Sequence, residues 1–329
     1  MREWYEDYKI LDAKDSRSLQ FSESGVLVYS TFSNNQFGLA KLSLHDDSHK
    51  SFVPLGHTKQ IREISVSNDS KLLLTSSQDN TIKLSNLESE NILHNWKSDG
   101  SVWGCKWSKT NENLFYTSVD DKVLLFDIRK TASSVSGRQI GEKHKPVHSV
   151  VPVETKGSNG STISGILCAT REGVFWTKLA DNLEENKTAA LPSLAGSCFH
   201  LTSNKNTSFF MASYVNTPTY SNTCHTVFEL LDDEGHVREE RTVFTAKKMP
   251  LVVPKTCLFT TKDTLFAVVP DKGPDVNDTV DLYDLKKGTK LQSLHSQPNL
   301  GDVIHFNFQG KDFLSTASKD TVYLYRHKE

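Results

Sequence analysis

The acidic, histidine and cysteine side chains are the residues of this sequence whose types could perform catalytic or metal chemistry. Adjacent carboxylates occur at Asp46-Asp47, Asp120-Asp121 and Asp232-Asp233, but each pair lies in a predicted turn, where aspartate bonds to nearby backbone. A glycosidase would need two carboxylates facing each other across a pocket. The five cysteines lack the Cys-x2-Cys spacing of zinc sites. No Gly-rich phosphate loop, His-Glu-x-x-His or Gly-x-Ser-x-Gly motif is present, so we expect no catalytic residue, metal or cofactor in this chain.

The elements that position these side chains follow a repeated pattern of short strands and tight turns. Residues 76–84 read SSQDNTIKL, 117–127 read TSVDDKVLLFD and 316–325 read TASKDTVYLY. Each segment ends one strand with small residues, turns at an aspartate and begins an alternating apolar strand. Asp79 and Asp120 lie about 41 residues apart, which is the length of one four-stranded propeller blade.

The segments that precede these turns repeat as well. Residues 16–30, 57–74 and 101–117 each place apolar residues, a polar turn and a second apolar stretch in the same order. Short strands at this turn spacing indicate an all-β protein, and no window shows convincing helical periodicity. We therefore predict a single seven-bladed β-propeller, with blades near residues 16–55, 56–99, 100–143, 144–193, 194–250, 251–297 and 298–329.

The two ends of the chain complete the predicted ring. The last blade ends one strand short, at Tyr325-Arg326-His327, whereas the segment from Trp4 to Leu11 precedes the first blade and has no partner strand there. We predict that residues 1–12 supply the missing outer strand of the last blade. Such closure is favoured because it removes exposed sheet edges.

Several of these positions match the marks of a known repeat family. Gly56-His57 and Phe126-Asp127 stand where blades of the WD40 family carry Gly-His and Trp-Asp, so the chain resembles that family. In WD40 blades a buried histidine, a strand serine or threonine and the turn aspartate form a hydrogen-bonded network. The resemblance assigns such structural roles to His57, Ser77, Asp79 and Asp120.

A narrower resemblance covers residues 54–135. The stretch KQIREISVSNDSKLLLTSSQDNTIKLSNLESENI, with Ser85-Asn86 where Trp-Asp belongs, is followed by VWGCKW and VLLFDIRKTASSV. This combination is similar to the C-terminal propeller of the RING-finger and WD-repeat E3 ubiquitin ligases that act at stalled replication forks. The resemblance implies a nuclear domain that recruits substrates, chiefly replication protein A, in the DNA damage response. The catalytic RING of that family needs Cys-x2-Cys spacings, which are absent here, so we expect an excised domain or a member without its RING.

The resemblance also points to one surface. In WD-type blades, the residue just after the first apolar position of the innermost strand faces the upper mouth of the central channel. In this sequence the positions are Arg17, Arg62, Trp103 and His148 in the first four blades and Ile304 in the last blade. Gln60, two residues upstream of Arg62, is expected at the same mouth. Arginine and tryptophan are enriched at interface hot spots, so this rim would form a cationic, aromatic socket for an acidic peptide or helix. The alternatives are that Trp103 packs between blades and that Arg17 and Arg62 are ordinary solvated arginines.

Two other function classes stay open. A WD40 scaffold in a chromatin or RNA-processing complex would share all the fold observations, and an enzymatic propeller would require a metal or an acid pair at the mouth.

The formal net charge of −2 provides no general basic field, so we expect protein partners rather than direct nucleic-acid binding. No apolar run approaches the ~18 residues of a membrane span. We expect a monomeric propeller.

Overall fold

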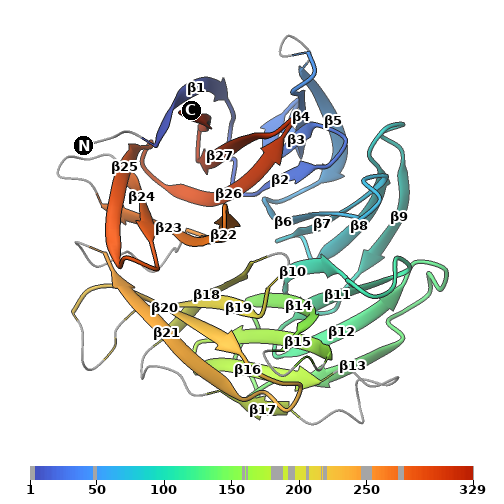
Figure 1. Cartoon of the computed structure of the whole chain (residues 1–329). Coiled ribbons are helices and arrows are strands. Elements are labelled where there is room, and N and C mark those ends of the chain that lie inside the picture. Colours follow the sequence, from blue (N-terminus) through green and yellow to red (C-terminus); the bar gives the residue numbers. More distant parts are fainter. Residues whose placement is uncertain are drawn as a thin grey trace.

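The computed structural model describes residues 4–46, 50–157, 160, 162–178, 188–191, 197–204, 207–215, 217, 221–245, 254–272 and 278–328. Within these ranges, every regular element is a β-strand, and the strands form seven sheets of four strands each. Figure 1 shows the sheets arranged around a central axis. We number them as blades in chain order, with the innermost strand first. None of the described residues forms a helix long and apolar enough to cross a membrane.

The first three blades follow the sequence without interruption. Blade 1 contains β2 (Leu19–Ser22), β3 (Val26–Ser33), β4 (Gln36–Ser43) and β5 (Lys50–His57). Blade 2 contains β6 (Ile61–Val66), β7 (Leu72–Ser77), β8 (Thr81–Asn86) and β9 (Ile92–Lys97). Blade 3 contains β10 (Val102–Trp107), β11 (Leu114–Val119), β12 (Lys122–Asp127) and β13 (Ser136–Gln139).

Blades 4 to 6 repeat this antiparallel arrangement although their sequences lack most family marks. Blade 4 contains β14 (Ser149–Lys156), β15 (Thr162–Thr170), β16 (Gly173–Lys178) and β17 (Thr188–Ala190). Blade 5 contains β18 (Ser197–Ser203), β19 (Phe209–Val215), β20 (Cys224–Leu230) and β21 (Val237–Phe244). Blade 6 contains β22 (Cys257–Thr261), β23 (Thr264–Lys272), β24 (Asp278–Asp284) and β25 (Thr289–His295).

Blade 7 joins the two ends of the chain. It contains β26 (Leu300–Phe308), β27 (Lys311–Ser318), β28 (Thr321–His327) and, as its outermost strand, β1 (Tyr5–Asp12). The pairing of β1 with β28 is antiparallel and runs from Tyr5 opposite His327 to Asp12 opposite Thr321. Figure 1 shows β1, in dark blue, in the same blade as the red strands of the C-terminus. The predicted all-β, seven-bladed ring closed by the N-terminal strand is confirmed.

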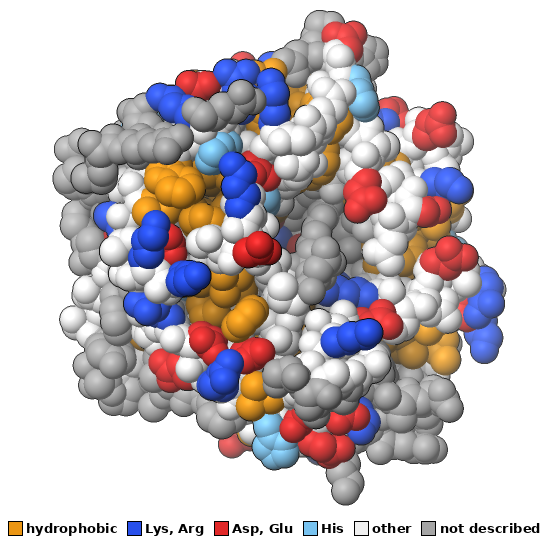
Figure 2. Space-filling view, viewed as in Figure 1, with side chains coloured by type: hydrophobic (Ala, Val, Ile, Leu, Met, Phe, Trp, Pro, Cys, Tyr) orange, Lys and Arg blue, Asp and Glu red, His pale blue; other side chains and the backbone are white. Residues whose placement is uncertain are grey.

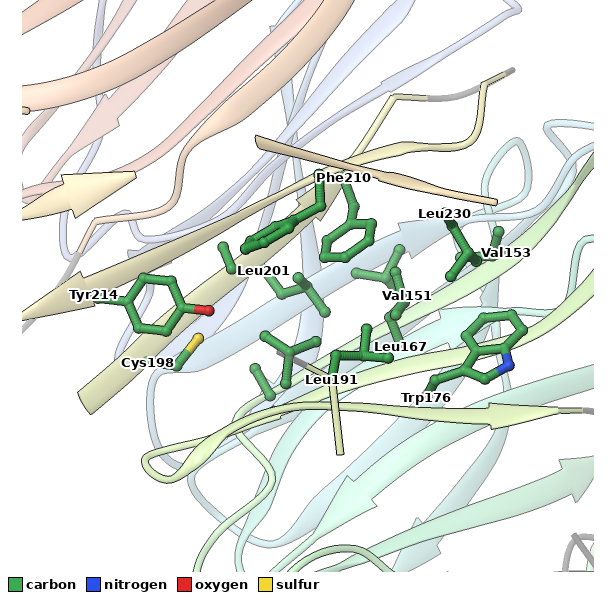
Figure 3. Close-up of a cluster of buried hydrophobic side chains, with 14 of the residues drawn as sticks. Val151, Val153, Leu167, Trp176, Leu191, Cys198, Leu201, Phe210, Tyr214 and Leu230 are labelled. Carbon is green, nitrogen blue, oxygen red and sulfur yellow. The ribbon is translucent and has the colours of Figure 1, made fainter. Parts of the chain in front are cut away.

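The hydrophobic core lies between neighbouring blades. Alternating apolar residues of each sheet face the next sheet, and between blades 4 and 5 they form a cluster that includes Trp176, Leu201 and Phe210 (Figure 3). The Trp176 indole is fully buried, and its Nε1–H donates to the carbonyl oxygen of Asp233 at 2.8 Å. Each fully buried side chain of this size contributes about 1.5–3 kcal/mol of hydrophobic stabilisation. On the face drawn in Figure 2, positive and negative side chains are interspersed, in keeping with the near-zero net charge.

Candidate functional site

Four of the innermost strands carry a β-bulge shortly after they begin. In β6 the pairing passes from Ile61 directly to Glu63, so Arg62 is an extra residue without an opposite partner. The same skip occurs in β10, β18 and β26, where the extra residues are Trp103, Phe199 and Gly301. A bulge bends its strand and changes the direction of one side chain, which explains how these residues leave the sheet pattern and face the channel.

The equivalent positions of all seven blades line one cavity of about 700 Å³. It lies at the face where the innermost strands begin, which we call the upper face, and we call the cavity the upper cavity. In each blade the position follows a buried residue, such as Ile61 before Arg62 or Val102 before Trp103. We call these seven residues the upper ring: Arg17, Arg62, Trp103, His148, Phe199, Lys255 and Gly301.

A stacked cation and aromatic ring form one wall of the upper cavity. The Arg62 guanidinium carbon lies 3.9 Å from the centroid of the Trp103 ring, a cation–π geometry that stabilises by about 0.5–2 kcal/mol. The Arg62 Nε and the Trp103 Nε1 are buried and have no hydrogen-bond partner within the described part of the chain. Both atoms carry hydrogens, so the wall offers two unused donors. Trp103 is therefore neither a simple core residue nor freely solvated.

Arg17 lies on the same rim and adds a second guanidinium. Burial lowers the pKa of Arg17 in spite of Asp302, and burial together with the charge of Arg17 lowers the pKa of Arg62. Both guanidinium groups nevertheless stay protonated, because arginine begins above 12. Among the described residues, no carboxylate lies within 4.0 Å of either guanidinium. The rim thus holds two half-buried positive charges without an ion-pair partner.

The floor of the cavity is an ion-pair cluster across the channel. The Lys255 Nζ lies 3.0 Å from the Glu63 carboxylate and 3.0 Å from that of Asp302, and the Lys106 Nζ lies 2.9 Å from Glu63. Burial alone would raise the pKa of Glu63, but Lys106 and Lys255 lower it to about 2. Burial raises the pKa of Asp302 in spite of Lys255. The two cations and two anions balance, so the floor is neutral as a whole.

Below this floor the channel continues as a second cavity of about 580 Å³. Glu63 and Lys255 line both cavities, so their ion pair lies where the two meet. Ile304 lines only this lower cavity. The expectation that Ile304 represents the last blade at the upper mouth is wrong: β26 begins at Leu300, and the bulge makes Gly301 the equivalent residue.

Two of the histidines that line the cavity, His148 and His200, are neutral. The His148 Nε2 donates to the carbonyl oxygen of Cys198 at 2.9 Å, and burial lowers the pKa of His148 to about 4. Hydrogen bonding to the backbone of Cys198 and Thr170 offsets part of this lowering. Burial also lowers the pKa of His200, whose Nδ1 accepts from the backbone N–H of Thr256. Neither ring adds positive charge at neutral pH.

Gln60 does not reach the upper cavity. Its side-chain amide donates to the carbonyl oxygen of Asp15 at 3.2 Å, so it connects blade 2 to the segment leading into blade 1. The sequence rule placed Arg17, Arg62, Trp103 and His148 together, and the structure brings these four to one cavity. The residues predicted from the rule do not include Phe199 of blade 5 and Lys255 of blade 6, which line the same cavity. The signal was present, because each follows a small or apolar residue, Cys198 or Pro254, that is buried.

The structural network around His57 differs in one partner from the expectation. The His57 Nδ1 donates to Asp79 at 3.0 Å, and its Nε2 accepts from the hydroxyl of Thr75, not from Ser77, at 2.9 Å. Ser77 acts beside it, where its hydroxyl donates to the carbonyl oxygen of Lys59 at 2.8 Å.

Asp120 makes a different and more exposed contact. Its carboxylate accepts from the Ser101 backbone N–H at 3.0 Å, and the side chain is exposed. It therefore belongs to no buried network, which corrects the expectation that it pairs with buried donors. No group of three or more His, Cys, Asp or Glu side chains that could hold a metal ion occurs among the described residues.

The sequence and fold match known proteins. Residues 4–326 match the family of the E3 ubiquitin-protein ligase RFWD3 WD40 domain. E3 ubiquitin-protein ligase RFWD3 of Ailuropoda melanoleuca is 26% identical over 303 residues, which cover 88% of this chain and 38% of that protein. The Homo sapiens protein of the same name is 25% identical over 304 residues, with the same two shares. The chain thus spans 38% of the length of these curated relatives.

Solved structures agree on the architecture. The β-propeller domain of Cps50 (Swd1) from Myceliophteria thermophila superimposes with a TM-score of 0.71 at 12% identity, covering 98% of this chain and 99% of that one. A chain of the Mitotic Checkpoint Complex gives a TM-score of 0.71 at 12% identity, covering 100% of this chain and 94% of that one. At such low identity, these likenesses concern the fold alone.

Proposed function

The chain belongs to the family of the E3 ubiquitin-protein ligase RFWD3 WD40 domain, and from this membership we propose that it holds the substrate protein for a ubiquitin ligase. The observation that carries the proposal is the upper cavity, in which seven blades contribute one residue each to a cationic, aromatic surface. The chain spans 38% of the length of such a ligase. The proposal assigns ubiquitin transfer itself to the rest of the ligase. The domain then supplies recognition and no chemistry.

The physical case for partner binding rests on Arg62 and Trp103. Arginine and tryptophan dominate binding energy when they lie in a concave, largely desolvated site, and both side chains here are half-buried with unused donors. An acidic segment of a partner would accept from these donors, and its charge would offset that of Arg17 and Arg62. The partner is therefore a protein with an acidic peptide or helix and an apolar residue beside it.

We choose replication protein A as the first partner to test. Residues 54–135 resemble the propeller of ligases that recruit this single-strand DNA-binding complex in the DNA damage response, and the family match extends that resemblance to residues 4–326. The proposal accordingly places the domain in the nucleus. It also assigns binding to the protein subunits of the complex rather than to DNA.

The experiment is a pull-down of each purified replication protein A subunit by the chain and its variants. Trp103→Ala and Arg62→Glu should leave a folded propeller that no longer retains the subunit. Lys130→Glu is the matched control: it makes the same charge change in the turn after β12 of blade 3, at the opposite face from the upper cavity, and Lys130 is exposed. Unchanged retention by Trp103→Ala and Arg62→Glu would refute the upper cavity as the binding site. Retention of no subunit by the unaltered chain would refute this partner.

A further inference from the structure

The upper cavity has an excess of positive charge that its own residues do not balance. The floor pairs two cations, Lys106 and Lys255, with two carboxylates and is neutral. Above it, the guanidinium groups of Arg17 and Arg62 lie on the wall without a carboxylate within 4.0 Å in the described structure. Arg171, which lines the rim, is exposed and adds to the same sign. Two half-buried positive charges are therefore available to a ligand.

This arrangement is unfavourable in the empty molecule. Even partial removal of a charged group from water costs free energy when no opposite charge pairs with it, and two neighbouring guanidinium groups also repel each other. The loss of solvation is real here, since the Arg62 Nε and the Trp103 Nε1 are buried and have no partner among the described residues. An anion placed against the Arg62–Trp103 wall would satisfy these donors and offset the repulsion.

The number of positive charges distinguishes between the anions that a protein partner can offer. A carboxylate brings one negative charge and two oxygens, so it balances only one of the two guanidinium groups. A phosphorylated serine or threonine brings about −1.5 to −2 charges and three acceptor oxygens at pH 7. Arginine forks bind phosphate in bidentate geometry. The pair formed by Arg17 and Arg62 matches the dianion better than the monoanion.

The rest of the cavity fits a peptide better than a free ion. Its volume of about 700 Å³ lies in the range of sites that enclose drug-sized ligands, far more than one phosphate group fills. Phe199 and the ring of Trp103 offer apolar faces beside the charged wall.

We propose that the upper cavity is a phosphopeptide site, in which Arg17, Arg62 and the Trp103 indole N–H hold a phosphorylated serine or threonine of the partner. This inference rests on the proposed function, because it specifies the chemistry of the partner that the same cavity binds. Phosphorylation of the partner then creates the docking group, so a kinase acts before the ligase on the same substrate. An unmodified acidic residue at that position binds the cavity more weakly.

The test follows the Trp103 indole N–H directly. The chain contains five tryptophans, so a 15N-labelled sample gives five indole signals, and Trp103→Phe identifies the one from the cavity. N-acetyl-O-phosphoserine amide, N-acetyl-glutamate amide and inorganic phosphate are titrated separately into the full chain. We expect the Trp103 signal to shift with the phosphoserine compound, with an affinity at least tenfold higher than for either other probe. The four remaining indole signals should stay in place.

Variants then assign the charge. Arg62→Gln should weaken phosphoserine binding at least tenfold, while Lys130→Gln, on the opposite face, should not change it; unchanged positions of the other indole signals show that each variant is folded. A glutamate compound or inorganic phosphate that binds as tightly as phosphoserine would overturn the proposal, and so would a Trp103 signal that ignores all three probes. The two proposals fail separately. If replication protein A binds in an Arg62-dependent way but the phosphoserine compound does not bind, only the phosphopeptide proposal fails. If the phosphoserine compound binds but replication protein A does not, only the choice of this partner fails.

Discussion

Replacing Lys255 by methionine should destabilise the propeller strongly and in a pH-dependent way. The Lys255 Nζ contacts the Ser18 hydroxyl at 3.3 Å and the carboxylates of Glu63 and Asp302, each at 3.0 Å. Methionine keeps the length of the side chain but removes the charge. Glu63 retains Lys106, whereas Asp302, with 4% of its side chain exposed, loses its cation and keeps the Leu19 N–H at 2.9 Å.

The magnitude follows from the burial of Asp302. Removing one partner of a buried ion pair costs about 3–5 kcal/mol, and we expect this loss of unfolding free energy at pH 7. Burial already raises the pKa of Asp302, and without Lys255 it should rise further. Between the pKa values of the unfolded and folded states, the folded variant then binds one more proton than the unfolded chain, so its stability relative to the unaltered chain grows as pH falls. From pH 7 to pH 5 the recovery should reach up to about 2.7 kcal/mol.

Urea unfolding followed by tryptophan fluorescence at pH 7 and pH 5 measures both effects. Lys106→Met is the control, because Lys106 is 34% exposed and its loss leaves Glu63 paired with Lys255; it should cost about 1 kcal/mol or less. The His200 ring responds in the same direction, since burial and Lys255 both lower its pKa. The double variant Lys255→Met/Asp302→Asn isolates Asp302 and should lose most of the pH-dependent recovery. A Lys255→Met loss below about 1 kcal/mol at pH 7, or an equal loss at both pH values, would show that Asp302 does not depend on Lys255 as its counter-charge.

Three further predictions concern stability and the shape of the rim. Thr75→Val leaves a buried histidine nitrogen without its 2.9 Å donor and should cost about 1–3 kcal/mol in urea unfolding. Asp120→Ala removes the acceptor of the Ser101 N–H and places alanine at a φ of 48°, so it should cost about 1 kcal/mol; a Thr75→Val loss below about 0.5 kcal/mol would contradict the buried network around His57. Burial lowers the pKa of His225, which is 1% exposed, to about 3. Between pH 6 and 4 the unfolded chain therefore binds a proton at this residue that the folded chain does not bind. The free energy of unfolding should fall by about 1.4 kcal/mol per pH unit in this range because of His225. His225→Gln should remove that part of the slope, and an unchanged slope would disprove the role. Gly301→Ala would place a Cβ 3.0 Å from the Cα of Arg17, so the Arg17 backbone must shift, stability should fall by about 1–3 kcal/mol and partner affinity should fall several-fold. Normal affinity in the folded variant would show that Arg17 is not a contact.

The fold could be predicted from the sequence because its marks repeat. Turn aspartates such as Asp79 and Asp120 recur at the length of one blade, and each blade obeys the same alternation of apolar residues. The closure by β1 can be predicted by counting strands: the C-terminal end of the chain supplies only three strands to the last blade, and the segment that begins at Trp4 has no partner strand in the first blade. These are local or periodic features that need no three-dimensional information.

The site could be predicted only where the repeat is well kept. The positional rule reaches Arg62 and Trp103 because Ile61 and Val102 begin clear apolar strands. It fails at Ile304, because the bulge that makes Gly301 the facing residue depends on strand pairing. The floor was beyond sequence reasoning altogether, since Lys255 and Glu63 are 192 residues apart and meet only when the ring closes.

The proposed function depends on binding of the partner protein at the upper cavity. The most direct measurement is the dissociation constant of the chain for replication protein A, determined by biolayer interferometry for the unaltered protein, Arg62→Glu and Lys130→Glu. We predict that Arg62→Glu weakens binding at least about tenfold, or about 1.4 kcal/mol, and that Lys130→Glu leaves it unchanged. Equal affinities for all three proteins, or a loss confined to Lys130→Glu, would contradict the claim.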